Sequence, residues 1–137
     1  MEQDYDAVAL AHRLFDALGR GDREGVMETI ADGAVVWHNY DDREKPFADR
    51  IDGLMRASRV TEGFHYAERR YVALPGGALV QHRLRGQVPG GAAFDAPIIV
   101  RFYLDGARIE RFEEYFDQAT LAPLYAAMRA AAGPAAQ

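Results

Sequence analysis

Four strand-like segments follow one another in the second half of the chain, and they constrain its fold more than any other feature. They cover residues 64–74, 78–88, 93–104 and 107–117. The segments are separated by strong turn signals, namely Pro75-Gly76-Gly77, Pro89-Gly90-Gly91 and Asp105-Gly106. Three consecutive turns of this kind predict an antiparallel meander.

The first half of the chain predicts helices around a single strand. From Tyr5 to Leu18, apolar side chains recur every three or four residues, which indicates an amphipathic helix. Asp22 is a suitable N-cap for a short second helix that extends to Ile30. The remaining elements are a strand at 34–40 and helices at 48–59 and 120–132. This order predicts an α+β fold, with helices packed on one face of a curved antiparallel sheet.

Length and composition indicate an ordinary globular protein. The 137 residues can bury one core but not two, so residues 1–137 are expected to form a single domain. No apolar run approaches the ~20 residues of a membrane span. The acidic start, Met1-Glu2-Gln3-Asp4, is unlike a signal peptide. We therefore expect a cytoplasmic protein that does not bind membranes.

The absence of cysteine narrows the available chemistry. A chain with no cysteine has no disulfide, no thiolate nucleophile and no Cys-type zinc site, which leaves His, carboxylate, Tyr and hydroxyl groups. The net charge of -5 argues against a nucleic-acid partner, which normally requires a basic surface.

Polar residues gather where the strand at 34–40 ends. Its apolar pattern leads directly into Trp37-His38-Asn39-Tyr40-Asp41-Asp42. A strand that ends this way can deliver polar groups to a pocket, although it can also simply leave the core for a loop. Because side chains alternate along a strand, only one of His38 and Asn39 can face the interior.

Two further candidates lie on the meander. His82 alternates with Gln81 and Arg83 and shares its side of the strand with apolar residues, so its imidazole is expected on the buried face. A histidine in this position is either a core residue or a catalyst. Of Glu113 and Glu114 one must face outward, and we expect Glu114 to face inward.

Two segments carry a family resemblance. The stretch FDALGRGDREGVMETIADGAVVWHN near the start and the stretch VRFYLDGARIERFEEYFD near the end resemble the NTF2-like superfamily, in particular its SnoaL-like branch. This resemblance implies a cone in which helices close over a bent sheet around an apolar cavity. The superfamily includes ketosteroid isomerases, scytalone dehydratase, polyketide cyclases, limonene-epoxide hydrolase and many non-catalytic binders, so fold alone does not assign a function.

Comparison with two members of that superfamily tests the candidates. The catalytic aspartate of the isomerases falls on His38 or Asn39, while the places of their oxyanion donors hold Leu14 and an isoleucine, Ile98 or Ile99. A steroid isomerase of the usual design is therefore not expected. In comparison with the epoxide hydrolase, Asn39 and Glu114 could hold a water molecule. Its Arg-x-Asp pair is replaced here by His82 and Leu84.

These residues suggest cofactor-independent acid–base chemistry. A histidine beside a carboxylate can move protons near neutral pH, and His82, His38 or Asn39, and Glu114 are expected to line one cavity. The expected substrate is a small, largely apolar molecule with an oxygen function. Aromatic residues are expected to line its pocket: Trp37, Phe64, Phe112 and Phe116. No metal or cofactor is expected, because no ligand motif of known spacing is present.

A second interpretation is a binding or assembly module of the same fold without catalysis. An enclosed cavity with convergent polar groups would favour the enzyme, and a wholly apolar interior would favour the module. In either case we expect a homodimer through the convex face of the sheet.

Overall fold

The computed structural model describes residues 6–133, and its first two helices begin at aspartate N-caps. Helix α1 (Ala7–Arg20) starts at Asp6, whose side chain accepts a hydrogen bond from the amide of Ala9. Helix α2 (Arg23–Met27) starts at Asp22, which accepts from the amide of Gly25, as predicted. Gly21 ends α1 with a φ of 68°, a left-handed conformation that favours glycine. The predicted helix start at Tyr5 lies outside the described residues.

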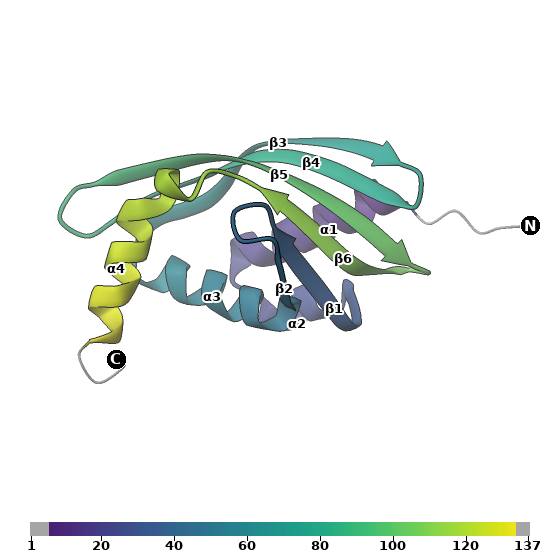
Figure 1. The fold of residues 1–137 in the computed structure, drawn as a ribbon, viewed down its shortest axis with the longest axis horizontal. Coiled ribbons are helices and arrows are strands. Elements are labelled where there is room, and N and C mark those ends of the chain that lie inside the picture. The colour runs from purple at the N-terminus through teal and green to yellow at the C-terminus, as the bar shows by residue number, and fades with distance from the viewer. Residues whose placement is uncertain (1–5, 134–137) are drawn as a thin grey trace, which may run out of the picture.

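Six strands form one curved sheet, shown across the upper part of Figure 1. They are β1 (Ile30–His38), β2 (Arg43–Pro46), β3 (Glu62–Leu74), β4 (Gly77–Gln87), β5 (Ala93–Asp105) and β6 (Arg108–Tyr115). The spatial order is β2-β1-β6-β5-β4-β3. The predicted meander is confirmed as β3 to β6, since each of these strands pairs antiparallel with the next.

The structure adds two features that the sequence did not predict. Strand β1 pairs with β6 in parallel, so the sheet is mixed. Strand β2 forms in the polar segment after β1 and closes a hairpin with it. The second helix is also shorter than predicted, because it ends at Met27 and Ile30 opens β1.

The helices cover one face of the sheet. Helices α1, α2 and α3 (Phe47–Arg59) lie beneath it in Figure 1, and α4 (Ala122–Ala132) hangs from one end. A short 3-10 helix, η1 (Gln118–Leu121), leads into α4 and is capped by the side chain of Asp117. Along β5, every second side chain from Phe94 to Phe102 is buried against the helices. The core therefore lies between the concave face of the sheet and α1 to α3. Separately, no helix among residues 6–133 is long and apolar enough to cross a membrane.

Candidate functional site

His38 and Glu114 meet on the buried face of the sheet, near the ends of β1 and β6. The parallel pairing of β1 with β6 sets them side by side in register, and they are 2% and 7% exposed. Nε2 of His38 lies 3.3 Å from Oε1 of Glu114. Neither ring nitrogen of His38 makes an aligned hydrogen bond to the described residues. The contact is therefore close enough for proton transfer after a small adjustment.

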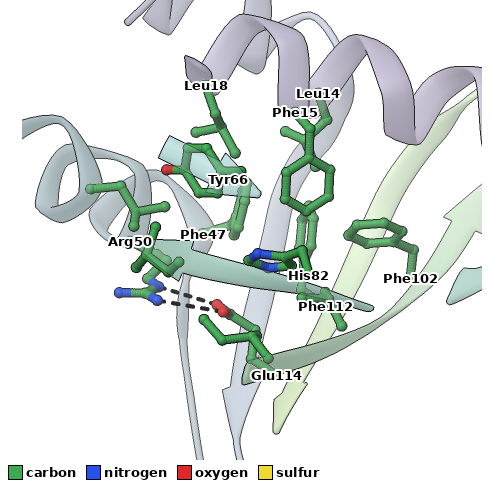
Figure 2. A pocket seen from close by; sticks show the side chains of 14 residues that line it. Leu14, Phe15, Leu18, Phe47, Arg50, Tyr66, His82, Phe102, Phe112 and Glu114 are labelled. Atoms are coloured by element: carbon green, nitrogen blue, oxygen red, sulfur yellow. Dashed lines mark hydrogen bonds and ion pairs between the residues drawn. The ribbon is translucent and has the colours of Figure 1, made fainter. Parts of the chain in front are cut away.

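Arg50 on α3 binds both oxygens of the same carboxylate. Its Nε donates to Oε1 of Glu114 over 3.1 Å, and its Nη2 donates to Oε2 over 3.4 Å (Figure 2). Burial by itself would raise the pKa of Glu114. The charge of Arg50 and the nearby His38 lower the pKa by more than burial raises it, so that it lies below its ordinary value. Glu114 is thus ionised at neutral pH.

His82 on β4 is the second buried imidazole of the site. It is 6% exposed, its ring lies 5.0 Å from that of Phe15, and its Nδ1 has no hydrogen-bond partner among the described residues. Burial lowers the pKa of His82 to about 4, although the charge of Glu114 opposes this shift. Glu114 therefore favours the charged imidazole, but burial outweighs this attraction and leaves His82 neutral at neutral pH.

Tyr66 on β3 completes the polar groups around the site. Its ring lies 5.8 Å from that of His82, and Tyr66 lines the same cavity. Burial raises the pKa of Tyr66, so the hydroxyl remains a donor at neutral pH. Sequence reasoning missed Tyr66, although it lies two residues after Phe64 and alternation places both on one face.

Arg50 was also missed by sequence reasoning, and the signal for it was present. It lies three residues after Phe47 and four before Leu54, so it falls on the apolar stripe of α3. An arginine on the buried stripe of a helix requires an anionic partner in the core.

Apolar side chains surround these groups and leave a small cavity (Figure 2). They come from α1, α3 and the meander strands: Leu14, Phe15, Leu18, Phe47, Leu54, Leu84, Ile98, Val100, Phe102 and Phe112. The free volume is about 30 Å³, room for about two water molecules. A larger ligand would require the surrounding side chains or helices to move apart.

Solved structures of the same shape identify the fold. An NTF2-like protein from Burkholderia thailandensis aligns with a TM-score of 0.72 at 17% identity, over 87% of this chain and 96% of that chain. A proposed SnoaL-like polyketide cyclase from Shewanella putrefaciens gives 0.69 at 17% identity, over 90% and 98%. The fold is NTF2-like.

A third structure with the NTF2-like fold contains a ligand. It is a hypothetical protein from Catenulispora acidiphila with a ketosteroid isomerase-like fold, solved in complex with trimethylamine. Its TM-score is 0.68 at 12% identity, and the alignment covers 84% of this chain and 90% of that chain. No protein-family model and no curated protein matches the sequence. The comparisons therefore show the fold and leave the activity open.

The NTF2-like architecture brings some predicted site residues together and separates others. His38, His82, Glu114 and Phe112 face the concave interior. Asn39 does not, because it faces the opposite way and its Oδ1 accepts a hydrogen bond from the amide of Phe116 over 3.0 Å. Of the two alternatives at the end of β1, the inward residue is His38.

Three of the four predicted pocket aromatics lie outside the cavity. Trp37 is on the opposite face of the sheet, where its ring packs on Tyr115 and its Nε1 donates to Asp42 over 2.8 Å. Phe116 packs behind His38 with a ring separation of 6.1 Å, and Phe64 packs against Phe94 at 6.4 Å. Phe112 alone lines the cavity as predicted.

Proposed function

We propose that the protein is a cofactor-independent acid–base enzyme that acts on a small, largely apolar molecule with an oxygen function. The observation that carries this proposal is that Glu114, Arg50 and His82 line one apolar cavity, while His38 lies 3.3 Å from the carboxylate of Glu114. Buried polar groups without partners are costly, and they are retained mainly where a ligand or water satisfies them. Such a set of side chains can relay a proton, eliminate water from a substrate or activate a water molecule.

The residues would have distinct roles. His38 would accept or donate the proton, and the ionised carboxylate of Glu114, 3.3 Å away, would orient its imidazole. Neutral His82 would form a hydrogen bond to the ligand through its free Nδ1. Arg50 would keep Glu114 ionised and in place. We place the isomerase, dehydratase, cyclase and hydrolase reactions together here, because each needs only these groups.

A binding screen followed by a turnover assay tests the proposal. Aromatic ketones, lactones, steroids and terpene epoxides would be screened by thermal shift, and a ligand at 100 times its dissociation constant should add about 2.7 kcal/mol of stability. Each hit would then be followed by NMR for chemical change. We expect His82→Ala and Glu114→Gln to weaken or abolish both binding and turnover.

The chain offers matched controls for these variants. Gln81 precedes His82 and Glu113 precedes Glu114, and both side chains lie on the opposite face of the sheet. Gln81→Ala and Glu113→Gln should leave binding and turnover unchanged. If these variants lower turnover as much as their inward neighbours do, the site has been placed wrongly.

The small cavity favours one alternative, a non-catalytic ligand-binding or assembly module. A free volume of about 30 Å³ is far below the ~300–1,000 Å³ of ordinary ligand pockets. This alternative predicts that ligands bind without chemical change, or that only protein partners bind. A turnover that depends on His38 or Glu114 would exclude it.

A further inference from the structure

Arg50 uses only one edge of its guanidinium. Among the described residues that line the cavity it is the sole arginine or lysine. Its Nε and Nη2 are bound to Glu114, while Nη1 and the second hydrogen of Nη2 have no hydrogen-bond partner among residues 6–133. The bonds of 3.1 and 3.4 Å are longer than the ~2.7–2.9 Å of strong charge-assisted bonds. The guanidinium is therefore held on one edge and free on the other.

The free edge lies where a ligand could reach it. The side chain of Arg50 is 19% exposed, about twice the 10% of Glu114, so part of this side chain contacts solvent. Figure 2 shows Glu114 occupying one edge of the guanidinium within the pocket. An incoming group can thus approach Arg50 without first displacing Glu114.

Two tyrosines outside the cavity lining, Tyr40 and Tyr125, lie within range of the charge of Arg50. Burial raises the pKa of Tyr125 to about 12 and also raises that of Tyr40, while Arg50 opposes both shifts. Both hydroxyls therefore stay protonated at neutral pH and can donate hydrogen bonds. No carboxylate other than Glu114 lines the cavity among the described residues.

We infer that the free edge of Arg50 is a carboxylate site, and that the ligand is a small monocarboxylate whose apolar body enters the cavity. This inference rests on the proposed function and adds the chemical class of the ligand. The planar fork of a guanidinium matches the oxygens of a carboxylate, and a neutral carbonyl can use only part of it. The guanidinium then bridges two carboxylates, and the partial exposure of Arg50 limits the desolvation cost of the second one.

Two probes of nearly equal shape test the inference. 3-Phenylpropanoate carries the carboxylate, and 4-phenylbutan-2-one carries a methyl ketone in its place. Their dissociation constants would be measured by calorimetry at pH 7. We expect the wild-type protein to bind the carboxylate at least ~10-fold more tightly than the ketone, a ratio typical of one good charge-assisted contact.

Variants of Arg50 assign the preference to its guanidinium. Arg50→Met alone would leave Glu114 charged and unpaired, so it is combined with Glu114→Gln to keep the cavity neutral and folded. This double variant should bind both probes equally. Arg50→Lys keeps the charge but loses the fork, and its ratio should fall between the two. Arg56→Met, at an exposed position of the same helix, should keep the wild-type ratio.

The outcomes separate this inference from the proposed function. If the wild-type protein binds the ketone as tightly as the carboxylate, the carboxylate site is refuted while the ligand cavity stands. A carboxylate preference that persists in the double variant refutes the role of Arg50. If neither probe binds and the wider screen also yields no ligand, the proposed function and this inference fall together.

Discussion

The two buried imidazoles of the site differ in what surrounds them. His82 lies among aromatic rings, and burial lowers its pKa to about 4. His38 lies beside Glu114, with 3.3 Å between nitrogen and oxygen. His38 is therefore the better placed for proton transfer, whereas His82 is neutral across the physiological range and suited to hydrogen bonding. Alternation along the strand predicted that His82 is buried, but it does not reveal the neighbours of a buried group.

The lowered pKa of His82 predicts an acid sensitivity. Its ordinary value is 6.5 and its folded value is about 4, so the unfolded chain binds the extra proton between these pH values and stability rises with pH there. Lowering the pH from 7 to 4.5 should cost about 2 kcal/mol of unfolding free energy through this residue. Urea denaturation of the wild type and His82→Gln at both pH values would measure the difference.

His65 provides the control for that measurement. It is an exposed histidine on β3, so His65→Gln should retain the full loss of stability between pH 7 and 4.5. The pKa of Glu114 is lowered, so its contribution is present above its ordinary value of 4.5 and is lost only at more acid pH. An equal pH dependence in the wild type and His82→Gln would contradict the assignment.

At the scale of elements, two pairs of residues join α3 to β6: Phe47 with Phe112, and Arg50 with Glu114. Phe47 stacks on Phe112 with 3.6 Å between ring centres, and Arg50 reaches Glu114 alongside. Three residues of helix advance ~4.5 Å and two residues of strand ~6.7 Å, distances that side chains can bridge. The helix therefore packs on the strand through one apolar and one ionic contact, and all four residues line the cavity.

Asn39 joins the end of β1 to the chain that leaves β6. Its Oδ1 accepts from the amide of Phe116 over 3.0 Å, and its own amide donates to the carbonyl of Glu114 over 3.2 Å. We expect Asn39→Ala to lower the unfolding free energy by about 1 kcal/mol through the lost side-chain bond. Ligand affinity should be nearly unchanged, because the side chain lies outside the cavity. A large loss of affinity with unchanged stability in urea would return Asn39 to the site.

At the scale of the whole molecule, the two faces of the sheet have different chemistry. The concave face holds the core, and the convex face carries ion pairs such as Arg83 with Asp95 at 3.2 Å. Among these charges lies an apolar strip, in which Ile99 pairs with Tyr115 across β5 and β6 and Tyr115 packs on Trp37. Ile99 is 37% exposed and Tyr115 is 43% exposed. Exposed apolar groups of this kind commonly mark contact surfaces.

The strip supports the predicted homodimer through the convex face. We expect a dimer by light scattering at micromolar concentration, and Ile99→Lys should shift it to monomer by placing a charge in the contact. Ala126→Lys adds the same charge at an exposed position of α4 and should leave the dimer intact. A wild-type protein that is monomeric at this concentration would refute the interface.

The local features of this protein were determined by the sequence alone. Turn residues placed the four meander strands, the cap at Asp22 placed the start of α2, and alternation put His82 and Glu114 on the buried side. Each of these depends on a few neighbouring residues, so periodicity and turn chemistry are enough to predict it. Alternation along β3 also predicts that Tyr66 faces the same side of the sheet as Phe64.

Only the tertiary structure decided which of these residues meet. The parallel pairing of β1 with β6 chose His38 over Asn39 and set it beside Glu114, a partner 76 positions away in the chain. The docking of α3 then brought Arg50 to that carboxylate, and burial lowered the pKa of His82. Pairings across such separations depend on how every element packs together, and a pKa depends on the resulting surroundings, so neither is encoded in a local pattern.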